Sequence, residues 1–106
     1  MKIPANAYIP IEKITNYLLT KREKNDKSKF LAQAGFTRIN PESLIISIRE
    51  LIAENDAYIE RKTEYGIIYN VTGNLYGDHD IITVVTVWIL LDSDEKYRFV
   101  TLKPVR

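Results

Sequence analysis

The chain has 106 residues, of which 45% are apolar and 27% charged, a composition typical of one globular domain spanning residues 1–106. It contains no cysteine, which excludes disulfide bonds and thiolate metal ligands. The net charge of +1 conceals basic ends and an acidic middle, because residues 63–95 carry six acidic side chains and no basic one. Folding that brings the two ends together would create a basic face. Otherwise these charges are scattered over the surface.

The sequence patterns of a membrane anchor and of a signal peptide are both missing. The longest apolar run, residues 81–91, is too short to cross a bilayer as a helix, and its β-branched side chains favour a strand. Near the start of the chain, Pro4 and Pro10 interrupt any apolar stretch of signal-peptide length. We therefore expect a cytoplasmic protein that has no contact with the membrane.

The first half of the chain, residues 1–55, has the spacing of helices. A first helix is predicted over residues 11–20, where apolar residues recur every three or four positions. Its buried face would consist of Ile11, Ile14 and Leu18, with Tyr17 beside them.

Two further helices follow in this half. The second is expected to begin at Asp26, whose carboxylate can cap it, and to end at Gly35. The third covers residues 40–56, with Pro41 at its first helical position. Its buried stripe would consist of Leu44, Ile48, Leu51 and Ile52.

The second half, residues 56–106, changes to the two-residue period of strands, with turn sequences YGDHD and DSDE. Four strands are predicted, at residues 57–65, 66–76, 81–91 and 96–105. The expected fold is α+β, with three N-terminal helices packed on one face of a four-stranded antiparallel β-meander. The other face of the sheet would then be open to a ligand.

Basic residues mark a candidate site at the start of the second helix and on the last strand. Lys27 and Lys29 lie where free backbone N–H groups already favour an anion, and Lys13 of the first helix could point the same way. On the last strand, Arg98 has a planar guanidinium suited to phosphate, and Thr101 has a hydroxyl that could donate to a phosphoryl oxygen.

Alternation along the last strand divides its side chains between two faces. Tyr97, Phe99 and Thr101 would share one face, and Arg98 and Val100 the other.

Several of these residues also have an ordinary structural interpretation. Lys21, Arg22 and Lys24 are more simply a solvated connection between helices, and Thr101 is also a good strand former. Tyr69 and Trp88 are candidates for a binding surface on the open sheet face, although a lone tryptophan is more often buried.

Metal and cofactor chemistry is not indicated by any motif. His79, the only histidine, falls in the predicted YGDHD turn, where adjacent Asp78 and Asp80 would point to alternating sides. No glycine-rich phosphate loop, HExxH motif or activated serine context occurs. We therefore predict neither a metal site nor a cofactor.

The chain resembles a family of short, uncharacterised bacterial proteins common in cyanobacteria. The blocks that carry the resemblance are KITNYLL, DKSKFLAQAGF, NPESL, YGIIYNVTGNLYG, TVVTVWILL and YRFVTLKP, from about Lys2 to Pro104. The order of elements is similar to that of the barnase–EndoU–colicin–RelE group of small ribonucleases, in which N-terminal helices precede a four-stranded antiparallel sheet.

That resemblance implies a toxin-like, metal-independent endoribonuclease of a bacterial toxin–antitoxin pair, with RNA as substrate and a small antitoxin or immunity protein as partner. The 2′-hydroxyl of the RNA would attack the adjacent phosphate, while protein cations stabilise the phosphorane. Many members of the group use a histidine, for which this chain would substitute Lys, Arg, Tyr or Thr. The residues that match the family blocks are Lys13, Lys27, Trp88, Arg98 and Thr101.

Two other functions stay open at this point. The chain could be a protein-binding module of the antitoxin or immunity kind, whose acidic middle steers a basic partner. It could also be an inactive member of the nuclease fold that has kept only binding. The acidic residues of the binding hypothesis are Asp78, Asp80, Asp92, Asp94 and Glu95. The nuclease hypothesis requires instead that Lys27 and Arg98 meet across one groove.

Overall fold

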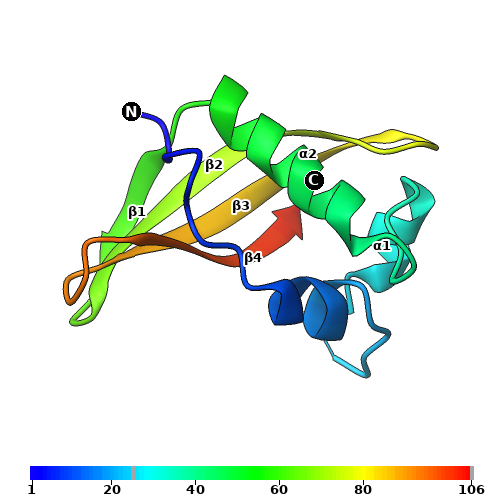
Figure 1. Cartoon of the computed structure of the whole chain (residues 1–106), viewed down its shortest axis with the longest axis horizontal. Coiled ribbons are helices and arrows are strands. Elements are labelled where there is room, and N and C mark those ends of the chain that lie inside the picture. The colour runs from blue at the N-terminus through cyan, green and yellow to red at the C-terminus, as the bar shows by residue number, and fades with distance from the viewer. Residues whose placement is uncertain (25, 106) are drawn as a thin grey trace.

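The computed structural model describes residues 1–24 and 26–105, with a helical first half and a β-sheet second half (Figure 1). The helical elements are the π-helix η1 (Lys13–Leu18), α1 (Ser28–Gln33) and α2 (Pro41–Glu54). The strands are β1 (Tyr58–Lys62), β2 (Gly66–Tyr76), β3 (Ile81–Leu91) and β4 (Tyr97–Pro104).

The strands form one antiparallel meander in the order β1-β2-β3-β4. The predicted α+β class and four-stranded meander are therefore confirmed. The bounds of β2 and β3 coincide with the prediction, whereas β1 and β4 are shorter because their ends leave the ladder.

Helix α2 packs against β2 and lies across one face of the sheet (Figure 1). Gly73 permits this close approach, because a Cβ at that position would meet the side chains of Asn55 and Leu51. The two shorter helical elements, η1 and α1, lie to the side of α2, near the end of β4 (Figure 1). The structure therefore does not confirm the prediction that η1 and α1 pack on the same face of the sheet as α2.

The N-terminal segment was not predicted to join the sheet, but it lies along the outer edge of β4. Tyr8 forms a parallel bridge with Arg98. The Tyr8 N–H donates to the Tyr97 carbonyl at 3.0 Å, and the Phe99 N–H donates to the Tyr8 carbonyl at 2.8 Å. This bridge covers part of a strand edge and leads the chain directly into η1.

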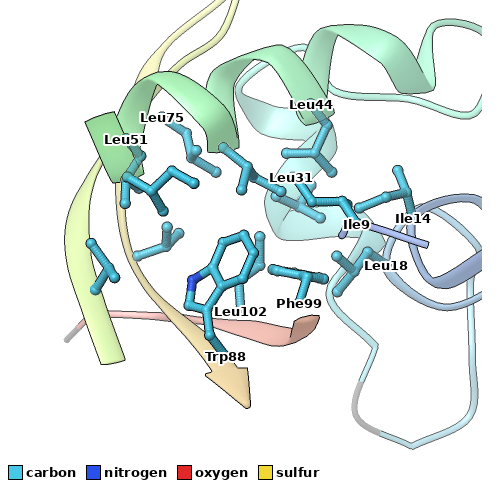
Figure 2. Packing of buried hydrophobic residues seen from close by; sticks show 14 of the residues in the cluster. Ile9, Ile14, Leu18, Leu31, Leu44, Leu51, Leu75, Trp88, Phe99 and Leu102 are labelled. Carbon is cyan, nitrogen blue, oxygen red and sulfur yellow. The ribbon is translucent and has the colours of Figure 1, made fainter. Parts of the chain in front are cut away.

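The core is centred on Trp88, which has 0% exposure and packs edge-on against Phe99 at a ring distance of 5.4 Å (Figure 2). Its indole N–H donates to the Thr86 hydroxyl at 2.8 Å, and that hydroxyl donates to the Val71 carbonyl at 2.9 Å. All the polar groups of this buried chain are therefore paired.

The core is continuous across the helical and β halves, since η1, α1, α2 and the sheet all supply apolar side chains to it (Figure 2). Its members include Ile14, Leu18, Leu31, Leu44, Leu51, Leu75, Phe99 and Leu102.

The two acidic turns lie at opposite ends of the sheet. Asp78 and Asp80 are at the β2–β3 turn, and Asp92, Asp94 and Glu95 are at the β3–β4 turn (Figure 1). An eleven-residue strand, β3, separates them, and at ~3.3 Å per residue it keeps the turns roughly 35 Å apart. The acidic middle of the sequence is therefore not one surface that a single basic patch could cover.

None of the helices within residues 1–24 and 26–105 has the length and apolar content needed to cross a bilayer.

Candidate anion-binding site

A cavity of about 400 Å³ lies between η1, the loop that follows it and strand β4. We call it the lysine pocket. Three of its lining residues are cationic and one is aromatic, and the remainder are apolar apart from one threonine. The lining consists of Lys13, Tyr17, Leu18, Arg22, Lys27, Val100 and Thr101.

Both lysines of the pocket are anchored to β4 by their ammonium groups. Lys13 Nζ donates to the Val100 carbonyl at 3.1 Å, and Lys27 Nζ donates to the Thr101 hydroxyl at 3.0 Å. Each contact joins residues more than 70 positions apart in the chain. Three of the four residues predicted as catalytic, Lys13, Lys27 and Thr101, therefore meet at one place.

The positive charge of the pocket is not neutralised locally. Within residues 1–24 and 26–105, no carboxylate lies within salt-bridge distance of Lys13 or Lys27. The acid next to Lys27 in the chain, Asp26, is engaged elsewhere, since it accepts hydrogen bonds from the Ser28 hydroxyl at 2.6 Å and the Ser28 N–H at 3.0 Å. These two bonds hold the pKa of the Asp26 carboxyl below its ordinary value.

Burial and repulsion both act on Lys27. Partial burial of its ammonium, followed by the nearby charges of Lys103 and Arg22, lowers the pKa of Lys27 below 10.5. A bound anion would reverse the second effect, because it would replace repulsion between cations with attraction. The site is therefore electrostatically suited to an anion.

Lys13 and Tyr17 line the same pocket because residues four apart in a helical segment lie on the same side of it. The segment closes with a bond from the Leu19 N–H to the Ile14 carbonyl at 2.9 Å, an i→i+5 bond of the π-helical type. Ile14 and Leu18 are buried, whereas Tyr17 and Ile11, which precedes η1, are exposed. The prediction that Ile11 belongs to the buried face is therefore wrong.

A β-bulge in β4 explains why Thr101 reaches the pocket. Trp88 pairs with Phe99, whereas Val87 pairs with Thr101, so that Val100 is an extra residue in the ladder. Phe99 therefore enters the core while Thr101 lines the pocket. The predicted sharing of one face by Phe99 and Thr101 is wrong, because strict alternation fails at a bulge.

Arg98 lies on the same strand but lines a different cavity, of about 640 Å³, together with Tyr8 and Arg49. Its guanidinium donates to Asp94 at 2.6 Å and lies 5.6 Å from the centre of the Tyr8 ring. The Arg98 hydrogen bond is also the main cause of the lowered pKa of Asp94. Arg98 is thus turned toward the β3–β4 turn. Lys27 and Arg98 were predicted to surround one phosphate, but they line different cavities.

The three residues predicted to bind a ligand lie outside the lysine pocket. Lys29 is exposed on α1 and does not line it. Trp88 is in the core, and Tyr69 is buried on the same side of the sheet, 5.5 Å from the ring of Tyr97. Both aromatic residues were candidates for an open sheet face, with burial as the more usual role of Trp88, and both lie in the core.

Two residues of the pocket were missed by sequence analysis. Arg22 was interpreted as part of a solvated connection and Tyr17 as part of a buried face, yet both line the cavity. Their guanidinium and ring stack with a separation of 4.6 Å. The run of basic residues at positions 21–29 indicated a binding site in this part of the chain. It could not distinguish Arg22 from its neighbours Lys21 and Lys24.

The described residues, 1–24 and 26–105, contain no group of three or more His, Asp or Glu side chains arranged to hold a metal ion.

The chain belongs to the family described as domain of unknown function DUF6883, whose model matches residues 3–106. The match covers nearly the entire chain, so the resemblance to an uncharacterised family is confirmed. No curated protein and no solved structure matches the chain. These comparisons give no ribonuclease relative, so the similarity to the ribonuclease group stays a prediction.

Proposed function

We propose that this protein is a toxin-like, metal-independent endoribonuclease that binds the phosphate backbone of RNA in the lysine pocket. The observation that carries the proposal is the convergence of Lys13, Arg22 and Lys27 on one cavity with no carboxylate among its lining residues. Uncompensated cations that share a cavity favour a phosphate, because its charge offsets their mutual repulsion.

The reaction would use the Lys27 amine as the general base. Lys27 lies in the pocket 3.0 Å from the Thr101 hydroxyl, and partial burial, followed by the charges of Lys103 and Arg22, lowers its pKa, which is the direction that a base requires. Its unprotonated amine would accept the proton of the RNA 2′-hydroxyl. The 2′-oxygen then bonds to phosphorus and the bond from phosphorus to the 5′-oxygen breaks, which leaves a 2′,3′-cyclic phosphate. The departing 5′-oxygen takes a proton from water.

The other pocket residues would position and stabilise these groups. Lys13 and Arg22 would face the extra negative charge on the phosphorane, where electrostatic stabilisation contributes most. Thr101 would fix the direction of the Lys27 amine through its 3.0 Å hydrogen bond. Lys27 and Arg98 do not meet across one groove, so the requirement stated from the sequence has failed. The proposal therefore puts Arg22 in place of Arg98 beside the phosphate, and Arg98 has no part in this step.

The test is cleavage of a 5′-labelled single-stranded RNA by the purified protein in excess chelator. We expect products that end in a 2′,3′-cyclic phosphate, and a rate at least about 100-fold lower for Lys27→Met, which lacks the base. Lys27→Arg should bind RNA but fail to cleave it, because arginine keeps the charge and cannot release a proton. Lys62→Met, on exposed strand β1, is the control that should cleave normally.

RNA that stays intact with the wild-type protein, or cleavage that survives Lys27→Met, would contradict this proposal.

A toxin-like role adds a partner to the proposal, namely an antitoxin or immunity protein. Expression of the wild-type protein in a bacterial host should arrest growth, and expression of Lys27→Met should not. Co-expression of the neighbouring gene should relieve the arrest if it encodes such a partner. Normal growth with intact RNA on expression of the wild type would count against the toxin role.

A further inference from the structure

An exposed aromatic side chain at the rim of the lysine pocket lies outside the core. Tyr17 is 54% exposed and is absent from the core cluster, although its neighbours Ile14 and Leu18 belong to it. The guanidinium carbon of Arg22 lies over its ring, 4.6 Å from the centre, and both residues line the pocket that holds Lys13 and Lys27. A planar cation and an aromatic ring are therefore in contact next to the proposed phosphate position.

We propose that Tyr17 and Arg22 form a stacking platform for one unpaired base of the RNA, next to the phosphate held by the lysines. The proposal rests on the proposed function, because it takes the RNA backbone to occupy the pocket. It specifies the substrate class as single-stranded RNA, or the single-stranded loops of a folded RNA. The base would extend the existing stack of ring and guanidinium.

The reasons are chemical and geometric. Every base has a flat π face, and tyrosine and arginine both stack on such faces with little dependence on sequence. A base inside a duplex is already stacked between its neighbours and cannot reach a side chain without leaving the helix. The platform would therefore favour an unpaired base and leave the choice among the four bases largely open.

The platform also complements the charges of the pocket. Lys13 and Lys27 are held on β4 by hydrogen bonds, so their amine groups have fixed positions beside the bound phosphate. Arg22 joins the two subsites, since it lines the pocket and its guanidinium carbon lies over the Tyr17 ring. One nucleotide could thus be held at both its phosphate and its base.

The experiment measures binding of three probes to the full chain carrying Lys27→Arg, which prevents cleavage. The probes are a short oligouridylate, an RNA duplex of equal length, and inorganic tripolyphosphate, which has charge but no base. The oligouridylate should bind more tightly than the duplex. Tyr17→Ala should weaken oligouridylate binding by roughly 5- to 100-fold, the effect of one lost stacking contact, and leave tripolyphosphate binding unchanged.

Two variants separate stacking from folding and from charge. Tyr17→Phe keeps the ring and should bind oligouridylate like the parent protein. Arg22→Lys keeps the charge but loses the plane, and should weaken oligouridylate more than tripolyphosphate. Tyr65→Ala removes a tyrosine that is 68% exposed before strand β2, and should change nothing.

Equal binding of oligouridylate by the parent and Tyr17→Ala would overturn the platform. So would an equal loss of oligouridylate and tripolyphosphate binding, because that pattern indicates damage to the anion site. The ribonuclease activity can be refuted independently of the platform. This would be the result if oligouridylate binding is normal and depends on Tyr17, while the protein that carries Lys27 does not cleave RNA.

Discussion

The core around Trp88 and the lysine pocket adjoin the same strand, yet they follow opposite physical rules. β4 sends Phe99 and Leu102 into the core, and Val100 and Thr101 toward the pocket. In the core, the one indole N–H is buried and paired. In the pocket, three cations gather with no carboxylate among the lining residues, and partial burial, followed by repulsion from Lys103 and Arg22, lowers the pKa of Lys27.

This difference teaches how to distinguish residues kept for folding from residues kept for binding. Core side chains stabilise the fold by their burial, so their loss must lower the free energy of unfolding. Crowded cations oppose the fold slightly, so their loss should not lower it. Substitutions in the two regions are therefore expected to have opposite effects on stability.

The largest effect is expected from Trp88→Ala in the core. Truncation of this fully buried side chain should lower the free energy of unfolding by about 3–5 kcal/mol, because it leaves a cavity and removes the indole N–H that donates to the Thr86 hydroxyl. Urea denaturation measures the loss, and Trp88→Phe should give a smaller one if the alanine variant does not fold. A loss below about 1 kcal/mol would mean that the core is not centred on this residue.

A smaller but definite loss is expected from Gly77→Ala at the β2–β3 turn. A Cβ there would collide with the Ala34 carbonyl at the end of α1, which also accepts the His79 N–H at 3.0 Å. The turn would have to move away from α1, at a cost of about 1–3 kcal/mol. Asp78→Ala, exposed in the same turn, is the control and should stay within about 0.5 kcal/mol of wild type in urea denaturation.

Lys27→Met should keep or raise the melting temperature although it removes two favourable features, a charge and a hydrogen bond to Thr101. The reason is that burial and the charges of Lys103 and Arg22 already disfavour the ammonium form. Lys29→Met, from an exposed position on the same helix, should leave the melting temperature unchanged. A clear drop for Lys27→Met alone would show that Lys27 supports the fold.

The smallest effect is a pH dependence of stability that depends on Lys27. Its pKa is lowered in the folded protein, so between that value and 10.5 the folded state binds fewer protons than the unfolded state. The free energy of unfolding contributed by Lys27 must then rise with pH across that window. Urea denaturation from pH 8 upward should show the wild type gaining stability relative to Lys27→Met, and a relative loss would contradict the lowered pKa.

The sheet could be predicted from the sequence because its signals are local. Residues 66–76 and 81–91 are β-branched and apolar runs bounded by Gly66 and by turn sequences, and they became β2 and β3 with the same bounds. The end of α1 could also be predicted, since Gly35 has a φ of 103° just after the helix.

The site could be predicted only in part, because a local irregularity helps to create it. The sequence pointed to Lys13, Lys27 and Thr101, but strict alternation would put Thr101 on the same face as Phe99. The bulge at Val100 changes that expectation. It has no composition signal, because it arises from how the strand packs against the remainder of the protein.

The most direct test of the central claim, that the lysine pocket binds the RNA backbone, is the salt dependence of binding to a single-stranded oligonucleotide. Log K against log salt concentration should be linear for the non-cleaving Lys27→Arg protein, and its slope should become shallower by about 0.7 when Lys13→Met is added, because one phosphate contact is lost. Adding Lys62→Met instead should leave the line of Lys27→Arg unchanged. If the added Lys13→Met gives the same slope and affinity as Lys27→Arg alone, the pocket is not where the RNA phosphate binds.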